Sequence, residues 1–542
     1  MTRLPTQSPP PRRCAALLLA LAALLGPTAP AAADEPAAQP QVSRFDLWEF
    51  EVEGNTVLDA PAIERAVSPF LGPERQMSDI EAARAALESA YQQAGYLTVL
   101  VDIPEQRIAD GVVRLSVLQG RLGQVWVTGS RYHAQGFIRQ ALPTATPGAV
   151  PNFNALQQEL ATVNRSDARR VQPVIKPGRL PGTVDLDLQV NDRLPLSASV
   201  ELNNQHAAGT TPLRASATLR YDNLFQKDEA LALTVQTAPE RPSESRVLVL
   251  NYTWPRANGD AWGLTFTDAN SNVETLGGTQ ALGDGRTLGL RYHHNTSLGG
   301  WSGTVSAGAD LKHLQDTIAA GSSTLSTPLR YLPFQLAYNG GWTEGGDSLQ
   351  LSTQLTVAWQ RLLQRRVRCA GVAWQDQFDC KTQGASGSFG VFRLDGRWTQ
   401  AAWAGTQFST RVLTQIASGP LASAEQLSLG GTDTVRGYLE SEVPADHALV
   451  GSLEWRAPNL ASLIATGWTE LRPVGYVDLA RGWLAQPGSG QAPYGSLLAA
   501  GLGLRLNGPG LEAGLDLAWP MRATSHTPAH DPRLHVRLVA RY

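Results

Sequence analysis

The part of this chain most suited to specific chemistry is the segment 430–438, which reads Gly-Gly-Thr-Asp-Thr-Val-Arg-Gly-Tyr. Arg436 is its only cation, and the glycines around it permit the sharp backbone turns of a hairpin tip. A guanidinium presents a planar fork of N–H donors that can hold a carboxylate through two hydrogen bonds, which lysine cannot copy. The segment therefore predicts an ionic anchor for a loop.

The expected partner of this anchor is Asp478. It is the lone carboxylate among apolar side chains in the segment 473–482, at the position that strand alternation turns towards the interior of a barrel. Glu440 and Glu442 are nearer in the sequence and compete for the same guanidinium. A plainer interpretation also stays open, in which Arg436 is a solvated loop charge and Asp478 is one of many acids in a wet lumen.

Composition and charge favour an exported membrane protein. Charged residues make up 17% of the 542 residues and glycine is abundant at 51, whereas soluble enzymes usually carry more charge. The net charge of −3 comes without any block of like charge, so nucleic acid is not an expected partner. The histidines show no metal-ligand spacing and no Gly-x-Ser-x-Gly motif occurs, so neither a cofactor nor an enzymatic activity is expected.

Residues 1–33 have the three regions of a secretory signal peptide. Arg12 and Arg13 precede an apolar run over residues 14–25, and small residues lead to a predicted cleavage site after Ala33. The apolar run is too short for a membrane-spanning helix, and no later run reaches the length of about 20 residues that such a helix needs. A role in the membrane must therefore use β-strands.

Two small α+β modules are predicted after a short linker, residues 34–44. Over residues 45–120, and more loosely over residues 121–192, the pattern is strand, helix, helix, strand, strand. Asp59 is the expected cap of the first helix of the first module. For the second helix, a capping box of Ser78 with Glu81 is predicted. The expected apolar face of that helix consists of Ile80, Ala83, Leu87 and Tyr91.

The sequence pattern of residues 193–542 predicts a transmembrane β-barrel. Segments of about ten alternating residues recur about sixteen times, and short connections alternate with long ones. An open strand edge in lipid leaves backbone groups unpaired, so the strands must close into a ring. The prediction is a 16-stranded antiparallel barrel whose sixth outward connection, residues 419–446, carries Arg436.

The last segment shows the alternation most clearly. The side chains predicted to face lipid are Leu534, Val536, Leu538, Ala540 and Tyr542. Those predicted to face the lumen are Arg533, His535, Arg537 and Arg541. A slip of one residue would turn these polar groups into hydrocarbon, so the register is expected to be strongly specified.

Two cysteines remain after removal of the signal peptide. Cys369 and Cys380 lie in one polar loop, which is the fifth outward connection of the predicted barrel. A disulfide between them is expected in an exported protein, and free thiols or an intermolecular bond are the alternatives.

The motif residues Val435, Arg436, Gly437 and Tyr438, with the downstream strand residue Asp478, resemble the signature of the two-partner secretion translocators. These are the haemolysin and filamentous haemagglutinin secretion-activation proteins, in the superfamily that includes the barrel assembly proteins of the outer membrane. The two tandem modules are similar to the paired POTRA domains of that family. The resemblance implies periplasmic POTRA domains, an outer-membrane barrel and a sixth loop that tucks into the lumen.

The partner that this resemblance implies is a large secreted exoprotein with an N-terminal secretion domain, such as an adhesin, a cytolysin or a contact-dependent toxin. The POTRA domains are expected to catch it unfolded, by adding its strands to exposed sheet edges. The expected docking edge in the second module carries Val171, Val174, Ile175, Val184 and Leu186. Outer-membrane lipid and, during biogenesis, the barrel assembly machinery are further expected partners, and the protein is expected to be a monomer.

One departure from the family is expected at the N-terminus. Many members carry a plug helix before the first POTRA domain, but residues 34–44 are few and contain Pro36 and Pro40, so a plug helix is expected to be absent. The main alternative function is a factor that inserts other proteins into the outer membrane. Such relatives typically carry three or more POTRA domains. A passive porin would leave two periplasmic modules without a task.

Overall fold

The structure of the protein is a computed structural model that describes residues 44–542, apart from 109, 257, 277–278, 321–322, 370–372, 465 and 489–490. The side chains of residues 271–283, 316–327 and 369–373 also lie outside the described part. The predicted signal peptide, the linker up to residue 43 and the expected absence of a plug helix fall outside the described residues. None of the described helices is both long and apolar enough to cross a membrane.

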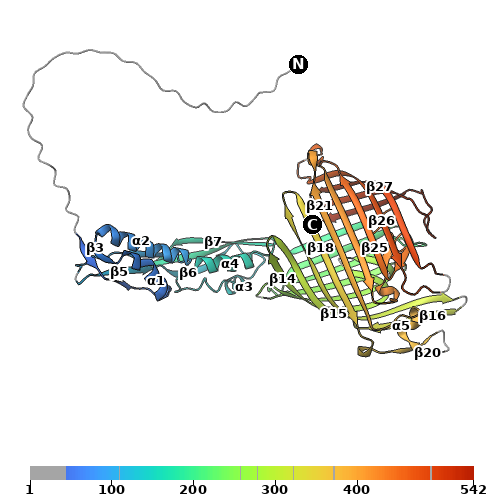
Figure 1. Cartoon of the computed structure of the whole chain (residues 1–542), viewed down its shortest axis with the longest axis horizontal. Helices are drawn as coiled ribbons and strands as arrows, with labels where there is room; N and C mark the ends of the chain where they lie inside the picture. The colour runs from blue at the N-terminus through green and yellow to red at the C-terminus, as the bar shows by residue number, and fades with distance from the viewer. Residues whose placement is uncertain are drawn as a thin grey trace, which may run out of the picture. The chain divides into compact units, whose positions relative to one another are not determined.

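The first module contains two small sheets and two α-helices (Figure 1). Its elements are β1 (Phe45–Leu47), β2 (Glu49–Glu53), α1 (Ala60–Val67), η1 (Ser68–Phe70), β3 (Gly72–Arg75), α2 (Met77–Gln93), β4 (Val99–Asp102) and β5 (Val112–Gln119). Strand β5 lies between β2 and β4, and β1 pairs with β3. The predicted order of strand, helix, helix, strand, strand is present, with β1 and β3 as additional short strands.

One of the two predicted helix caps is present in this module. Asp59 caps α1, because its carboxylate accepts a backbone N–H of the first turn at 3.2 Å. The capping box of Ser78 and Glu81 is wrong, because α2 begins one residue before Ser78. Instead, the carboxylate of Asp79 accepts the N–H of Gln76 at 2.8 Å. The predicted apolar face of α2 is buried: Ile80, Ala83, Leu87 and Tyr91.

The second module belongs to the same compact unit as the barrel. Its elements are β6 (Arg121–Thr128), α3 (Gln135–Gln140), α4 (Phe153–Val163), β7 (Arg169–Pro177) and β8 (Thr183–Asp192). Strand β8 is central, parallel to β6 and antiparallel to β7. Leu156, Leu160 and Val163 of α4 pack in the core of the module.

The prediction that β8 offers a docking edge is wrong, because β8 is the central strand of its sheet. Strand β7 is an edge strand, but most of its outer side is not open to another strand. Val184 and Leu186 lie in β8, whose backbone is paired on both sides and cannot receive another strand. On the outer side of β7, the N–H and C=O of Val171 are bonded to the side chain of Asn164 at 2.6 and 2.9 Å. Two residues further along the same side stands Pro173, which has no N–H to offer.

The remaining two predicted edge residues offer little to an incoming strand. Val174 is half-buried, and its backbone N–H and C=O point towards β8, because the backbone groups of successive residues alternate between the two sides of a strand. Ile175 has an exposed side chain and an outward N–H, between the prolines at 173 and 177. A single outward donor between two prolines is a poor template for strand addition, because the ladder is interrupted on both sides.

Residues 196–541 form the predicted closed antiparallel barrel (Figure 1). Its strands are β9 (Leu196–Asn203), β10 (Arg214–Leu224), β11 (Glu229–Thr237), β12 (Arg246–Pro255), β13 (Ala261–Leu276), β14 (Thr279–Leu298), β15 (Trp301–Ala320), β16 (Ser323–Tyr331), β17 (Phe334–Glu344), β18 (Asp347–Ala358), β21 (Phe389–Ala401), β22 (Gln407–Ala417), β25 (His447–Arg456), β26 (Glu470–Trp483), β27 (Tyr494–Gly508), β28 (Leu511–Pro520) and β29 (Arg533–Arg541). Because β16 and β17 pair with successive parts of β15, they share one place in the wall, which leaves sixteen strand positions. Strand β29 pairs with β9 and closes the ring.

The last strand has the predicted facing. Leu534, Val536 and Leu538 are exposed on the outer wall, whereas His535 is only 5% exposed. Arg537 points inward and binds Glu201 at 2.9 Å. The two-residue period of the strand therefore separates lipid-facing from lumen-facing groups as its sequence predicts.

Replacing Leu538 by arginine is expected to prevent stable insertion of the barrel. The substitution places a guanidinium on the lipid face near the middle of β29, at a cost of roughly 2–4 kcal/mol at the bilayer midplane. Folded barrel is measured as the heat-modifiable band in outer-membrane fractions, with Leu538→Val as the matched apolar control. Arginine at this position with a normal yield of folded barrel would contradict the assigned facing.

Two long outward connections matter for the site. The fifth, residues 359–388, holds η2 (Gln360–Leu362), β19 (Arg366–Cys369), β20 (Ala373–Asp376) and α5 (Gln377–Lys381). The sixth, residues 418–446, begins one residue before its predicted start; it is called loop 6 and holds η4 (Ser423–Glu425), β23 (Leu427–Leu429) and β24 (Val443–Ala445). Cys380 is disulfide-bonded, and the side chain of Cys369 lies outside the described residues, so their pairing stays a prediction.

Candidate functional site

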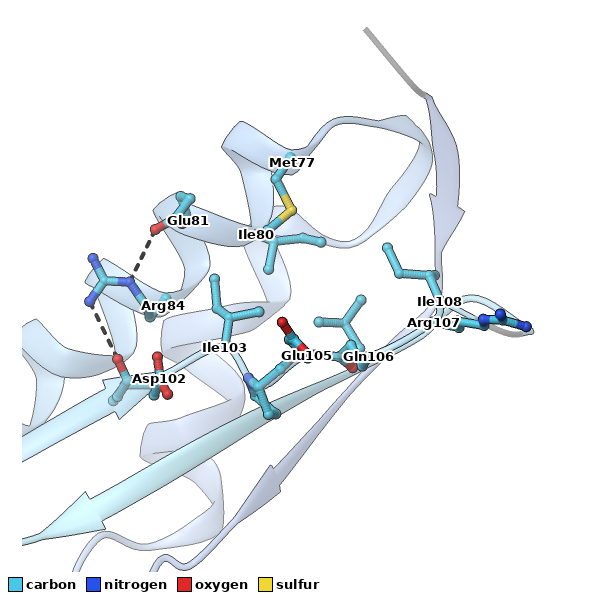
Figure 2. Close-up of a pocket in the computed structure, with 13 residues that line it drawn as sticks. Met77, Ile80, Glu81, Arg84, Asp102, Ile103, Glu105, Gln106, Arg107 and Ile108 are labelled. Carbon is cyan, nitrogen blue, oxygen red and sulfur yellow. Dashed lines mark hydrogen bonds and ion pairs between the residues drawn. The ribbon is translucent and has the colours of Figure 1, made fainter.

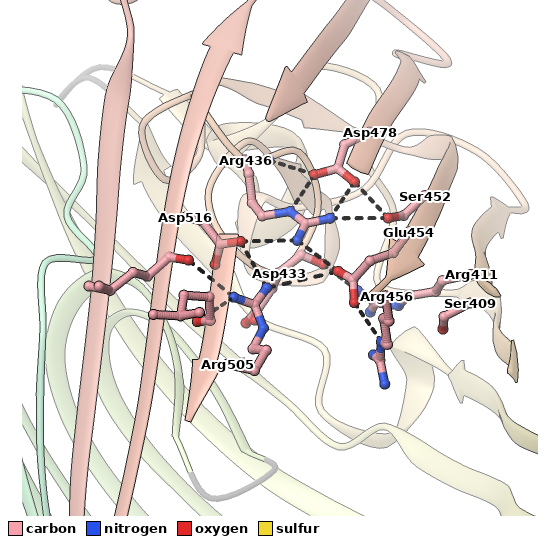
Figure 3. Close-up of polar contacts among 12 residues, drawn as sticks. Ser409, Arg411, Asp433, Arg436, Ser452, Glu454, Arg456, Asp478, Arg505 and Asp516 are labelled. Atoms are coloured by element: carbon pink, nitrogen blue, oxygen red, sulfur yellow. Dashed lines mark hydrogen bonds and ion pairs between the residues drawn. The ribbon is translucent and has the colours of Figure 1, made fainter. Parts of the chain in front are cut away.

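Loop 6 contacts the barrel wall through Arg436, whose guanidinium binds the carboxylate of Asp478 on β26 (Figure 3). The Nε of Arg436 donates to Asp478 Oδ2 at 2.7 Å, and Nη2 donates to Oδ1 at 2.8 Å. The backbone N–H of Arg436 donates to the same carboxylate at 3.2 Å. The side chain of Arg436 is only 9% exposed and that of Asp478 only 2%. The structure thus brings together Arg436 of the predicted loop tip and Asp478, which strand alternation had singled out as a lumen-facing acid.

Two further carboxylates complete the surroundings of Arg436, and sequence reasoning missed both. Its Nη1 donates to Glu454 of β25 at 3.0 Å and to Asp516 of β28 at 3.3 Å. Ser452, the register partner of Asp478 in β25, donates its hydroxyl to Asp478 at 2.6 Å. The alternation of β25 and β28 could have pointed to lumen-facing acids, but only the strand register shows which of them meet.

The acids around Arg436 are balanced by two more arginines. Arg456 donates to Glu454 at 2.8 Å, and Arg505 donates to Asp516 at 2.8 Å. Three guanidiniums therefore face three carboxylates, and the formal charge of the cluster is zero. Removing any one member leaves an opposite charge unpaired in a region with little access to water.

The ring of Tyr476 supports the guanidinium from its face. The Cζ atom of Arg436 lies 3.3 Å from the centroid of that ring. Tyr476 and Asp478 are two residues apart on β26, so both side chains point to the lumen. One wall strand therefore supplies both the counter-ion and the aromatic face, which holds the plane of the guanidinium in one orientation.

The other motif residues lock the neighbouring backbone. Val435 and Tyr438 are fully buried in the cluster under loop 6. Gly437 has φ +94°, which favours glycine, and its N–H donates to His535 Nε2 at 2.8 Å. The hydroxyl of Tyr438 lies 3.0 Å from the carbonyl of Leu498 and 2.9 Å from that of Arg522. The loop tip is therefore bound to β27, β29 and the connection between β28 and β29.

The two acids expected to compete for Arg436 have other contacts in the structure. Glu440 accepts the N–H of Thr432 at 3.2 Å within loop 6. Glu442 accepts the hydroxyl of Thr524 at 2.7 Å, in the connection before β29. Their bonds shape loop 6 and join it to the connection between β28 and β29, residues 521–532.

A second ionic contact holds the entry limb of loop 6, and we name it the Glu425 node. Glu425 is 5% exposed and accepts Lys312 Nζ of β15 at 2.6 Å and the hydroxyl of Tyr331 of β16. Its backbone carbonyl accepts a guanidinium N–H of Arg393 of β21 at 3.0 Å. Loop 6 is thus bound to β15, β16 and β21 at one end and to β25, β26 and β28 at its tip.

A separate candidate site is an open groove of about 880 Å³ in the first module (Figure 2). It is lined by α2 and by the segment 101–108, which contains the end of β4. The side chains of Met77 and Ile108 are 50% and 37% exposed there. Strand β4 is an edge of its sheet, so a groove lined by both apolar and charged side chains lies beside a strand that has no strand partner on one side within the described sheet. The carbonyl of Val101 in β4 accepts an N–H of the Arg84 guanidinium at 3.4 Å.

Comparison with protein families gives two matches. Residues 182–506 match the model described as haemolysin secretion/activation protein ShlB/FhaC/HecB, which covers more than half of the chain. Residues 45–120 match the model described as POTRA domain, ShlB-type.

Two relatives extend over most of the chain. One is the outer membrane transporter CdiB of Escherichia coli, 24% identical over 503 residues, which are 88% of this chain and 79% of the relative. The other is the heme/hemopexin transporter protein HuxB of Haemophilus influenzae strain 86-028NP, 20% identical over 427 residues, 77% of this chain and 73% of the relative.

Solved structures with a similar fold include CdiB from Escherichia coli and BamA from Haemophilus ducreyi lacking POTRA domains 1–3. The first has a TM-score of 0.59 at 18% identity and covers 94% of this chain and 93% of its own. The second has a TM-score of 0.54 at 14% identity and covers 92% of this chain and 100% of its own. At these identities the likeness concerns the fold.

Proposed function

Because this chain belongs to the haemolysin secretion/activation protein family ShlB/FhaC/HecB and is a two-partner secretion transporter of the outer membrane, we propose that Arg436 and Asp478 hold loop 6 in the arrangement that exports the partner. The observation that carries the proposal is the buried bidentate contact between loop and wall. Such a contact adds little net stability, but it specifies one position for the loop tip. The lumen is the passage, and loop 6 occupies part of it.

The proposed cargo is a large exoprotein with an N-terminal secretion domain, of the adhesin, cytolysin or contact-dependent toxin kind. Membership in the haemolysin secretion/activation protein family supports this class of cargo. The similar proteins CdiB and HuxB are themselves named as transporters. We further propose that the barrel works as a monomer in contact with outer-membrane lipid, after insertion by the barrel assembly machinery. Sixteen paired strands leave no free barrel edge within the described wall, which supports a self-contained unit.

The direct test is co-expression with a candidate exoprotein taken from a neighbouring gene. Full-length exoprotein is expected in the culture medium only when the transporter is present. An intact transporter that leaves the exoprotein in the periplasm, while the assembly of other barrels depends on it, would favour the assembly-factor alternative.

For capture in the periplasm, we propose the groove beside β4 instead of the second-module edge. The groove offers Met77 and Ile108 to apolar side chains and the edge of β4 to backbone groups of an extended segment. The edge of β7 is largely occupied by the side chain of Asn164 and interrupted by Pro173.

Replacing Met77 and Ile108 together by glutamate is expected to weaken capture about tenfold or more, because two charges replace the central apolar contacts. Binding of the exoprotein's N-terminal secretion domain to full-length transporter in detergent measures the effect. Ile175→Glu on β7 is the matched control and is expected to leave binding unchanged. Loss of binding in the control alone would return the docking site to the second module.

A further inference from the structure

Two arginines lie close together at the outer face of the barrel: Arg481 on β26, and Arg522 in the connection between β28 and β29. On β26, Val477 and Leu479 are 44% and 46% exposed to the outside, whereas Asp478 between them faces the lumen. Arg481 continues the outward series and is exposed. Strand β26 ends at Trp483, immediately before an outward connection, so Arg481 lies at the extracellular end of the wall.

Two aromatic rings flank this arginine. The Cζ atom of Arg481 lies 5.3 Å from the ring centroid of Trp483 and 4.7 Å from that of Tyr494. Trp483 and Tyr494 are register partners on the neighbouring strands β26 and β27. Tryptophan and tyrosine at this position are typical of the interface between membrane and water, and their faces hold a guanidinium at that level.

The second arginine reaches the same patch from the next connection. Ser496 is the register partner of Arg481, and its hydroxyl accepts a hydrogen bond from Nη1 of Arg522. The backbone of Arg522 is held by the hydroxyl of Tyr438, which lies 2.9 Å from its carbonyl. Within the described residues neither Arg481 nor Arg522 forms an ion pair, so two guanidiniums stand on one outward patch without a carboxylate.

Arg286 shows how another outward-facing arginine of this barrel is accommodated. Its side chain is 70% exposed on the same outer face as Leu288, and Asp268 lies 3.7 Å from it. A protein carboxylate thus accompanies that cation. Arg481 and Arg522 lack such a companion in the described chain, so both charges are available to an anion from the surroundings.

The geometry points to a binding site for a phosphorylated lipid of the outer leaflet. A guanidinium fork matches the oxygens of a phosphate group, and two forks beside a hydroxyl offer several donors to one phosphate. The lipid that places phosphates at this level of a bacterial outer membrane is the lipid A part of lipopolysaccharide. We therefore propose that Arg481, Arg522 and Ser496 bind a phosphate of lipid A. The rings of Trp483 and Tyr494 then contact the glucosamine that carries this phosphate.

The test uses full-length protein purified in detergent and freed of lipid. Purified lipid A, phosphatidylglycerol vesicles and inorganic phosphate are offered separately, and retained ligand is counted by native mass spectrometry. Wild-type protein is expected to bind one lipid A at the site, at least tenfold more tightly than phosphatidylglycerol. The double variant R481Q/R522Q is expected to lose this binding by at least tenfold, whereas R286Q is expected to stay within twofold of wild type.

Thermal unfolding gives a second readout that does not depend on counting ligands. Lipid A is expected to raise the melting temperature of the wild type and of R286Q, but to leave that of R481Q/R522Q unchanged. Equal lipid A binding by the double variant would overturn the proposal. An equal preference for phosphatidylglycerol, or saturation by inorganic phosphate alone, would also overturn it, because the site would then recognise any anion.

Discussion

Replacing Arg436 by alanine is expected to abolish secretion of the exoprotein while the barrel still inserts into the outer membrane. The substitution leaves Asp478 buried without its main partner, and breaking a buried ion pair in this way costs about 3–5 kcal/mol. The substitution is expected to displace loop 6 and to leave the wall intact, because the sixteen wall strands keep their own hydrogen bonds. Exoprotein in the medium measures secretion, and the heat-modifiable band measures insertion.

Two related variants sharpen this prediction. Arg436→Lys keeps the charge but cannot form both bonds to Asp478, so it is expected to secrete less than wild type. Exchanging the pair, as Arg436→Asp with Asp478→Arg, is expected not to restore secretion, because Glu454 and Asp516 would then face a third acid.

Asp433 supplies the matched control. It lies in the same loop, its side chain is exposed, and Asp433→Asn removes a charge without breaking the contact to the wall. This variant is expected to secrete normally. Wild-type secretion by Arg436→Ala, or failure of Asp433→Asn, would refute the role assigned to the ion pair.

The second large effect is expected from Glu425→Gln, which should make the pore leak. Loop 6 is bound to strands on different parts of the wall, by Glu425 at its entry limb and by Arg436 at its tip. Neutralising Glu425 leaves Lys312 without its counter-ion and weakens the attachment of the entry limb to β15 and β16. The expected results are larger single-channel conductance in planar bilayers and greater sensitivity of cells to bulky antibiotics.

A double-mutant cycle tests whether this effect belongs to the Glu425 node. Lys312→Met should raise conductance by a similar amount, and combining it with Glu425→Gln should add little, because both remove the same contact. Additive effects would show that the two residues act independently. Asp433→Asn again serves as the same-loop control and should leave conductance unchanged.

The sequence by itself determined most of the architecture of this protein. The two-residue alternation of strands such as β29 separates polar from apolar side chains, and lipid makes the wrong facing costly, so the facing is legible without coordinates. The same alternation singled out Asp478 as a lumen-facing acid, and the glycines around Arg436 marked a turning loop tip. These are local properties, each readable within about ten residues.

Only the tertiary structure decided which distant groups meet. Glu454 and Asp516 reach Arg436 because the register of β25 and β28 brings them level with it. Glu425 meets Lys312 although 113 residues separate them in the chain. Strand β8 lies at the centre of its sheet instead of at an edge, because it pairs with both β6 and β7. Alternation tells which face a residue takes, but pairing and register depend on the whole ring or sheet, because each strand is placed by its neighbours.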